Sequence, residues 1–351
     1  MSGFFSSFFS FFYPVCSVGT LSRIFVSGFC VTRSDEVSVV YSSFNLFPPH
    51  PFSSEYMRFN VVIPTFNEGS CIEACLRSIQ EANSSLTPLH QVSITISDGG
   101  SLDATTHIAS AWGAAVLGKA PSPHRGRGAQ LNHAVRHILS QDNSRDSIFF
   151  FLHADCTLQP GAFSALAEAF DDSSHLSSST ATTARVVTLH VQFQHPCFST
   201  RAQRGLLSLC ENWCNRKPSG GLYRSFGDAG IAVNRLALDE LELEGGFKPW
   251  PLMEDVDFFQ RARKRHRQKH SKLIIEKLER KTEGGVILVS PRRFEKEGYF
   301  RYMVKCGLLI TMHRCGISAE RLSKLYGPRR KGPPSEECNK AAILFRLHTQ
   351  N

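Results

Sequence analysis

The chain has 351 residues, of which 42% are hydrophobic and 20% are charged, and its formal net charge at pH 7 is +9. This apolar content excludes a chain that is disordered throughout, and the absence of a repeating period excludes collagen-like and heptad architectures. The charge is uneven, because residues 261–351 carry 23 Lys and Arg against 8 Asp and Glu, whereas residues 1–260 carry 17 against 23. A nucleic-acid footprint over the whole protein is therefore not expected.

Residues 1–56 differ in composition from the rest of the chain. Six phenylalanines alternate with serines in the first twelve residues, and no acidic residue precedes Asp35. Signal and transit peptides are Ser-rich and acid-poor in this way, but the positive leader of a secretory signal is missing here, since no charged residue precedes Arg23. Organelle targeting and a poorly ordered extension both stay open, and cytoplasmic and peripheral-membrane locations stay open with them. We expect the folded domain to begin at residue 57.

The eleven cysteines are scattered without a repeated short spacing. Two pairs are four residues apart, at positions 71/75 and 210/214, but neither pair has a second pair at the distance of a zinc site. We expect ordinary small buried residues rather than metal ligands, and a reducing compartment rather than a disulfide framework.

From residue 57 onward, strand and helix patterns alternate. Apolar, β-branched runs predict strands at 59–64, 92–97, 115–117 and 147–152. Helical spacing of apolar residues predicts helices at 70–82, 103–112 and 127–139. Further along, strands are predicted at 231–233 and 286–290 and a helix at 258–265. The alternation indicates an α/β fold of right-handed βαβ units, with a mostly parallel sheet flanked by helices.

Three segments interrupt this plan. Residues 173–183 are rich in Ser and Thr and predict a surface loop. Residues 264–281 form a strongly basic insert, in which His266 and His270 are four residues apart among Arg and Lys. Because those neighbours would repel a cation, a solvated charged helix is favoured over a metal pair. The basic tail at 328–351 is expected to be disordered.

Each of three predicted strands ends in an acidic residue. Glu68 follows the first strand, Asp98 follows the second, and Asp155 follows the apolar strand at 147–152. Parallel sheets bind ligands at the carboxyl ends of their strands, so we expect these acids to meet at one edge. Like charges repel unless a cation offsets them. Mn²⁺ or Mg²⁺ holding a diphosphate would account for the cluster, because both ions prefer hard oxygen ligands.

Two other segments carry charged side chains beside glycines. Arg125 and Arg127 alternate with glycines before the helix at 127–139, where arginine side chains and a helix N-terminus both favour a phosphate. Asp228 precedes the strand at 231–233. Arg125 and Arg127 are therefore candidate phosphate contacts, and Asp228 is a further candidate ligand contact.

The adjacent acids Glu254 and Asp255 lie at the start of a predicted helix. Carboxylates are favoured there by N-capping and by the helix dipole. The alternative is that one of them is a general base, which removes a proton from an attacking hydroxyl. The residues alone leave both interpretations open.

Six segments together carry a likeness to a known family. In chain order they are VVIPTFNE (61–68), SDGGSLD (97–103), RGRGAQLNHA (125–134), FLHAD (151–155), GDAGI (227–231) and PLMEDVD (251–257). They resemble family 2 glycosyltransferases of the GT-A fold, most closely the bacterial radical-SAM/selenodomain-associated subgroup, over residues 57–327. Within that span the family pattern implies a nucleotide-binding half at 57–170, an acceptor and catalytic half at 185–291, and C-terminal amphipathic helices at 292–327.

The resemblance implies an inverting transfer from a nucleotide-diphosphate sugar to an acceptor hydroxyl. Positions that match nucleotide-contacting residues of the family are Pro64, Glu68 and Asp98. Asp155 matches the last acid of the Asp-x-Asp metal motif, with His153 in place of the first acid, and His153 is therefore a candidate metal ligand. The catalytic acid pair is matched by Glu254 and Asp255, of which we assign Asp255 as the base. Arg292 and Arg293, after the strand at 286–290, are expected to clamp a diphosphate or an acceptor phosphate.

The acceptor is left open, and lipid-linked acceptors are among the candidates. Residues 299–326 combine a short apolar stretch with flanking basic residues, which fits a helix on an anionic membrane surface or, slightly better, a helix packed on the catalytic domain.

Two other functions compete with glycosyl transfer. A sugar nucleotidyltransferase needs a Gly-rich basic turn after the first strand, but the turn here is acidic and has no glycine before Gly69. A nucleic-acid-binding protein using the basic C-terminal quarter lacks a recognisable module with interleaved aromatic residues. A degenerate transferase is disfavoured because all the acid positions are filled.

Overall fold

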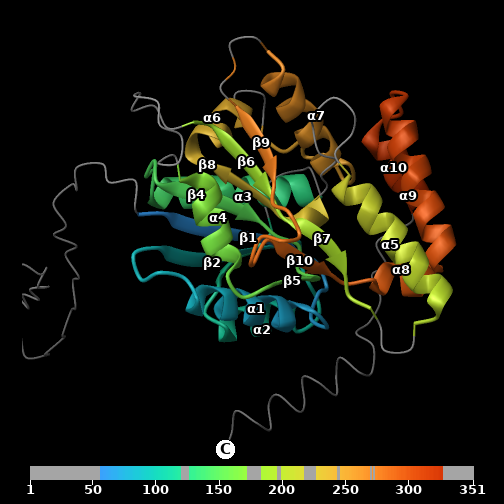
Figure 1. Cartoon of the computed structure of the whole chain (residues 1–351), viewed down its shortest axis with the longest axis horizontal. Helices are drawn as coiled ribbons and strands as arrows, with labels where there is room; N and C mark the ends of the chain where they lie inside the picture. Colours follow the sequence, from blue (N-terminus) through green and yellow to red (C-terminus); the bar gives the residue numbers. More distant parts are fainter. Residues whose placement is uncertain are drawn as a thin grey trace, which may run out of the picture. The chain divides into compact units, whose positions relative to one another are not determined.

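A computed structural model describes residues 56–119, 126–171, 183–195, 199–216, 227–242, 246–268, 271 and 273–326 (Figure 1). Contacts divide the chain into residues 1–51 and residues 52–351, and every described element belongs to the second unit. Arg125, His270, the basic tail, residues 1–55 and most of the Ser/Thr-rich segment lie outside the described residues.

The core of the fold is a sheet of seven strands in the order β3-β2-β1-β4-β8-β6-β9. Its strands are β1 (Arg58–Thr65), β2 (Gln91–Asp98), β3 (Ala115–Leu117), β4 (Ser147–Phe151), β6 (Arg185–Thr188), β8 (Ile231–Asn234) and β9 (Ile274–Lys277). All described pairings are parallel except those of β8, which is antiparallel to β4 and β6. The predicted mostly parallel α/β sheet is confirmed, as are the strands predicted at β1–β4 and β8.

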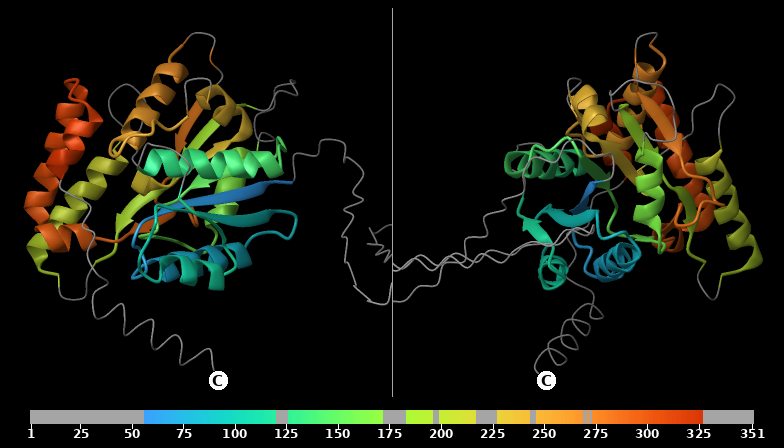
Figure 2. Two further views of the ribbon diagram at one scale, coloured as in Figure 1. Left: turned by 180° about the vertical axis from the view of Figure 1, so that it is seen from behind. Right: turned by 60° about the vertical axis from the view of Figure 1, so that its left-hand side comes forward.

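The sheet is apolar on both faces because helices cover both. In β4, every residue is buried; Ile148 and Phe150 join one hydrophobic cluster, and Phe149 and Phe151 join another on the opposite face. The first cluster takes in α1 (Ile72–Ser84), α2 (Thr105–Ala111) and α4 (Ala162–Phe170). The second takes in α3 (Arg127–Gln141), α6 (Arg235–Glu242) and α7 (Glu254–His266). Figure 2 shows α3 on one face and α1 with α2 on the other.

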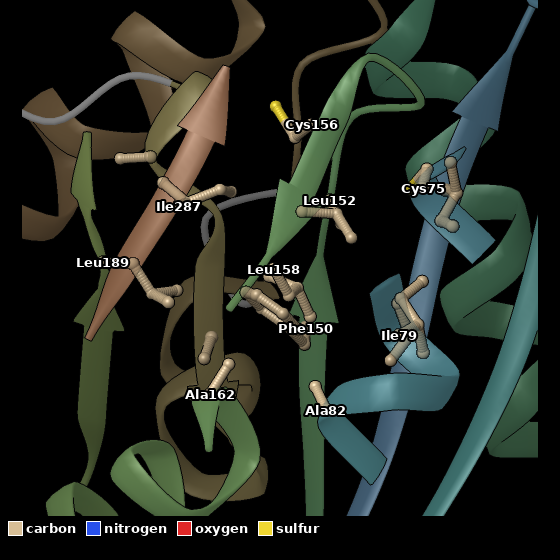
Figure 3. Packing of buried hydrophobic residues seen from close by; sticks show 14 of the residues in the cluster. Cys75, Ile79, Ala82, Phe150, Leu152, Cys156, Leu158, Ala162, Leu189 and Ile287 are labelled. Carbon is tan, nitrogen blue, oxygen red and sulfur yellow. The ribbon is translucent and has the colours of Figure 1, made fainter. Parts of the chain in front are cut away.

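A second sheet, which sequence patterns did not reveal, has the order β5-β10-β7. Its strands are β5 (Cys156–Leu158), β7 (His190–Phe193) and β10 (Val286–Val289). Leu158 and Ile287 of this sheet pack with Ile79 of α1 and Phe150 of β4 in the first cluster (Figure 3). Because β5 and β10 are antiparallel, the residue before β5 lies beside the residue after β10. This register brings Asp155 next to the start of the following helix.

Four more helices complete the described fold: α5 (Arg201–Asn215), α8 (Arg292–Glu297), α9 (Tyr299–Arg314) and α10 (Ala319–Tyr326). In Figure 1, α9 lies beside both α5 and α10. Leu309 and Leu322 of α9 and α10 also pack on Met253 and Val256 at the start of α7. Among the described helices, none is long and apolar enough to cross a membrane.

The basic segment 264–281 is not an insert throughout. Its first residues finish α7, and Ile274–Lys277 form β9, which pairs with β6 in parallel at the edge of the central sheet. The expectation of an insert outside the fold was wrong for these residues, because the surrounding charge hid a short strand. His266 is bonded within the fold, since its Nδ1 lies 2.6 Å from the carbonyl oxygen of Leu273.

Lys277 in β9 carries a buried charge. Its side chain is 4% exposed, and Nζ donates a hydrogen bond to the carbonyl of Cys214 at 3.0 Å. Burial lowers the pKa of the Lys277 ammonium from its ordinary value of 10.5 to about 8. The folded protein therefore binds fewer protons than the unfolded chain between about pH 8 and pH 10.5, so this group makes the protein more stable as pH rises through that range.

Replacing Lys277 by Met is expected to stabilise the protein at pH 7 by up to about 3 kcal/mol, because the buried charge is removed while the aliphatic stem is kept. The gain in the free energy of unfolding, measured by urea titration, is expected to shrink above pH 10. Lys281→Met is the matched control, since the Lys281 side chain is 85% exposed. A K277M variant that is less stable than the wild type at pH 7 would contradict the buried-charge explanation.

Candidate active site

The carboxyl edge of the central sheet gathers most of the predicted site residues. The strands β2, β1 and β4 are neighbours, so Asp98, Glu68 and His153 follow three adjacent strands. Strand β8 runs the other way, so its first residues lie at the same edge, and Asp228 precedes β8 beside the end of β4. This strand order places the three strand-end acids at the same edge of the sheet; their shared role at a ligand stays a prediction.

Pro64 lies near the end of β1, although proline lacks the N–H group that a central strand needs. The carbonyl of Val62 accepts a hydrogen bond from the N–H of Leu152 on the β4 side, at 3.0 Å. Because residues two apart along a strand face the same way, the nitrogen of Pro64 faces the same side, beyond the last residue of β4. Proline therefore fits where the pairing of β1 with β4 has ended, whereas the pairing with β2 continues as far as Thr65 and Asp98.

Asp98 organises the turn after β2. Its Oδ1 accepts hydrogen bonds from the hydroxyls of Thr65 (2.8 Å) and Ser101 (2.6 Å). Its Oδ2 accepts from the backbone N–H groups of Gly100 (2.8 Å) and Ser101 (2.7 Å). These four bonds use the acceptor positions of a carboxylate, and Asp98 is 4% exposed. The structure thus gives Asp98 a role in shaping the loop; its contact with a nucleotide stays a prediction.

Glu68 and Asp155 share one arginine. Arg292 Nη2 lies 2.5 Å from Glu68 Oε2 and 2.9 Å from Asp155 Oδ2, and Arg292 Nε donates to the same Asp155 oxygen at 3.1 Å. Arg292 begins α8, which follows β10, so the antiparallel pairing of β5 with β10 explains its position. Two acids and one arginine that the sequence singled out separately thus form one cluster.

His153 forms a link between Asp228 and Arg127. Its Nδ1 lies 2.8 Å from Asp228 Oδ1, and its Nε2 lies 3.2 Å from Arg127 Nη1. Arginine only donates hydrogen bonds, so Nε2 is the acceptor and Nδ1 carries the proton that Asp228 accepts. Desolvation would raise the pKa of Asp228, but the hydrogen bond from His153 and the charges of Arg293 and Arg127 outweigh it and hold that pKa well below its usual range.

Arg127 pairs with Glu254. Arg127 Nε lies 2.5 Å from Glu254 Oε1, and the Glu254 side chain is 2% exposed. The second oxygen of Glu254, Oε2, has no hydrogen-bond partner among the described residues. Burial and the nearby Asp255 carboxylate raise the pKa of Glu254, whereas Arg127 opposes the rise. The structure pairs Arg127 with this buried acid, and its predicted contact with a phosphate stays a prediction.

Asp255 occupies the first turn of α7, at the edge of the site. Its Oδ2 accepts the N–H of Gly227 at 2.8 Å, and its Oδ1 accepts the N–H of Val256 at 2.8 Å. A Cβ atom added to Gly227 would lie 2.7 Å from His153 Nε2 and 3.2 Å from Asp255 Oδ2, so these groups surround one point. Met253, just before the pair, has a left-handed backbone (φ 69°), a conformation that concentrates at functional sites in proteins.

The glycines at 126 and 128 have a structural use. A Cβ on Gly126 would collide with the carbonyl of Trp250, and a Cβ on Gly128 would collide with the carbonyl of Lys248. These glycines therefore let the start of α3 approach the loop that leads into α7.

Arg293 makes its hydrogen bond outside the Arg292 cluster. Its Nη1 donates to the Tyr326 hydroxyl at 2.8 Å, and that hydroxyl lies 3.2 Å from the hydroxyl of Tyr302. The role of Arg293 as an anion clamp stays a prediction.

Sequence reasoning missed residues that hold the site together. Gln130 Nε2 donates to the carbonyls of Thr65 and Ser97, each at 2.7 Å, and so ties α3 to the ends of β1 and β2. Tyr326 ends the last described helix and binds Arg293. The sequence does not reveal these roles, because each depends on contacts with residues that are distant along the chain.

The fold and this site define a mostly parallel α/β protein with an acidic, arginine-rich centre at the carboxyl edge of its sheet. Residues 60–210 match the model of the family described as glycosyl transferase family 2. This segment, which is less than half of the chain, accordingly resembles a glycosyl transferase family 2 domain and indicates an enzyme of the glycosyltransferase class. No curated protein matches the chain.

Solved structures similar to this chain include three enzymes. Glucosyl-3-phosphoglycerate synthase from Mycobacterium tuberculosis, in a complex with Mn²⁺, UDP and glucosyl-3-phosphoglycerate, is 20% identical over 75% of this chain and 81% of its own, with a TM-score of 0.44. The mannosyltransferase PcManGT from Pyrobaculum calidifontis, with GDP-Man and Mn²⁺, is 19% identical over 79% and 66%, with a TM-score of 0.44. S. aureus TarS is 16% identical over 68% and 38%, with a TM-score of 0.45. At such identities the donor and acceptor of this chain do not follow from these enzymes.

Proposed function

We propose that this protein transfers a sugar from a nucleotide-diphosphate sugar to an acceptor hydroxyl with inversion at the anomeric carbon. The observation that carries the proposal is the position of Asp255, whose carboxylate is fixed by two backbone N–H groups beside His153 and Gly227 at the carboxyl edge of the sheet. Glu68 and Asp155 supply further acidic groups from β1 and β4 at that edge.

In this mechanism, Asp255 is the general base. It accepts the proton of the acceptor hydroxyl as that oxygen attacks the anomeric carbon and the diphosphate leaves from the opposite face, so one displacement inverts the centre. The N–H groups of Gly227 and Val256 orient the carboxylate. Glu254 is unsuited to this role because its side chain is 2% exposed and paired with Arg127.

The residues at the edge fit Mn²⁺ or Mg²⁺ through the chemistry of their donor atoms. Asp155 and Glu68 are carboxylates that share one guanidinium, and His153 lies nearby, although the described residues include no group of three or more acids, Cys or His arranged to hold a metal. Asp155 would hold the ion with oxygens of the donor completing its shell. When bound, such an ion stabilises the negative charge of the leaving diphosphate. His153 Nε2 accepts a bond from Arg127, so His153 joins the ligands only if Arg127 moves.

We also propose that the nucleotide is held by the half at 57–170, through Pro64, Glu68, Asp98 and Arg125, and that the acceptor is held at 185–291 with the helices that follow. Membership of the radical-SAM/selenodomain-associated subgroup remains part of this proposal.

A thermal-shift screen of the full chain tests the function. The protein is heated with UDP-, GDP- and dTDP-sugars, each with and without Mn²⁺, and at least one sugar nucleotide is expected to raise Tm. Binding adds RT ln(1 + [L]/Kd) to stability, so a ligand at a hundredfold its Kd contributes about 2.7 kcal/mol. No shift with any sugar nucleotide would contradict donor binding.

The outer face of α9 supports a lipid-linked acceptor at an anionic membrane surface. Phe300, Val304 and Leu308 follow one another at helical spacing and are 65%, 41% and 58% exposed. Arg301 and Arg314 are exposed on the same helix, which contains no acidic residue. Apolar side chains beside basic ones are typical of helices that lie in a membrane interface. The protein is expected to cosediment with vesicles of anionic lipid and not with zwitterionic vesicles. Binding to neither kind of vesicle would contradict this membrane contact.

A further inference from the structure

The strongest unexplained feature of the site is the position of Arg292, between two carboxylates that would face the donor and the metal ion. We propose that Arg292 is a built-in counter-ion, which occupies Asp155 and Glu68 in the donor-free enzyme and must leave Asp155 before a divalent ion binds there. The inference rests on the proposed function, and it predicts that metal and nucleotide bind as a coupled pair.

The contacts of Arg292 come from two separate segments, the turn at 68–71 and Asp155. Its Nη2 lies between Glu68 Oε2 (2.5 Å) and Asp155 Oδ2 (2.9 Å), its Nε also bonds Asp155, and its Nη1 lies 3.4 Å from the Cys71 sulfur. In the part of the chain that the structure describes, Arg292 is the one cation paired with either acid. The side chains of Glu68 and Asp155 are 18% and 11% exposed, so solvent screens this cluster less than a surface pair.

The guanidinium and a divalent ion compete for the same oxygen. Asp155 Oδ2 receives two of the bonds from Arg292, and a metal ion on that oxygen would bring two cations together. A guanidinium also matches a phosphate in geometry and charge. A donor diphosphate therefore offers Arg292 a new anionic partner at the moment when the metal ion takes Asp155.

Arg292 is able to make this exchange. Its side chain is 31% exposed, and it starts a helix of only six residues. The neighbouring Arg293 bonds Tyr326 and leaves the two acids to Arg292. The metal ion alone is therefore expected to bind weakly. Nucleotide binding is expected to raise the affinity for the metal ion and, by linkage, metal binding is expected to raise the affinity for the nucleotide by the same factor.

The test measures Mn²⁺ binding to the full-length protein without nucleotide, from the electron paramagnetic resonance signal of the free ion. In R292Q the affinity for Mn²⁺ is expected to rise about tenfold or more, because two carboxylates lose their counter-ion. R293Q is the matched control, since it removes the same charge one residue away but leaves Arg292 in place. In R292Q/D155N the gain should disappear, which assigns it to Asp155.

The outcomes separate clearly. A rise in R292Q at least three times larger than in R293Q, absent from R292Q/D155N, supports the counter-ion role. A smaller difference, or a gain that survives Asp155→Asn, overturns it. If circular dichroism shows that R292Q does not fold, R292M, which keeps the aliphatic stem, takes its place in the same comparison. If no sugar nucleotide raises Tm but R292Q still shows the expected rise in Mn²⁺ affinity, the result contradicts the proposed function and leaves the counter-ion role in place.

Discussion

Asp255→Asn is expected to lower kcat by about 10² to 10⁴, the contribution of a general base, while the affinity for the sugar nucleotide changes little. The amide keeps the size of the side chain and one oxygen to accept from the N–H of Gly227 or Val256, but it no longer takes up a proton. Steady-state kinetics with the donor found in the thermal-shift screen would give kcat, and the same screen would give donor binding.

Asp257→Asn is the matched control, because it makes the same chemical change two residues along α7. Asp257 pairs with Arg261 on its own helix at 2.7 Å, away from His153, so turnover is expected to stay within twofold of the wild type. If Asp255→Asn retained full turnover, the base would have to be Glu254, and Glu254→Gln would then abolish activity.

Arg127→Leu is expected to destabilise the protein by about 3–5 kcal/mol, since it leaves the buried Glu254 carboxylate without its partner. The loss should depend on pH in a defined direction. Without Arg127, the pKa of Glu254 rises further in the folded state, so the folded protein holds a proton that the unfolded chain releases. Stability then falls as pH rises above the ordinary Glu value of 4.5, and the defect is smallest in acid.

The double variant R127L/E254L separates the buried charge from other effects of the substitution. Replacing both partners by apolar side chains removes the uncompensated charge, and it is expected to restore most of the stability lost in R127L. The free energy of unfolding from urea titrations at pH 5 and pH 8 measures both variants. A double variant as unstable as R127L would show that Arg127 stabilises the fold through His153 rather than through Glu254.

Sequence patterns identified the long elements of the fold and the edge at which the acids meet. Strands such as β4 and β1 are continuous apolar runs, and their alternation with helices determines a parallel order. By contrast, β5 and β7 have only three and four residues, and β9 lies among basic residues, so none has a periodic signal strong enough to predict it. The second sheet was missed for that reason, and with it the contact of Arg292 with Asp155.

The individual site residues were predicted less well than their location. A sequence shows that Arg127 and Glu254 are charged, but not that they pair with each other rather than with a ligand. Likewise, the sequence shows Gly128 only as a glycine at the start of a helix. Glycine is needed there because a side chain would collide with the carbonyl of Lys248, which is distant along the chain. Such pairings depend on tertiary packing, which one sequence does not specify by spacing.

The packing of α9 and α10 on Met253 has a consequence for how the enzyme is made. Ribosomes synthesise the chain from its N-terminus, so the sheet and the acids at Glu68, Asp98 and Asp155 emerge well before Leu309 and Leu322, which cover the left-handed residue before the Glu254–Asp255 pair. Arg292 and Tyr326 also come late. A nascent chain that ended after β10 would carry every acid of the site and yet lack both Arg292 and the residues that pack on Met253. If the proposed mechanism holds, we expect the enzyme to become competent only after the last described helix has left the ribosome.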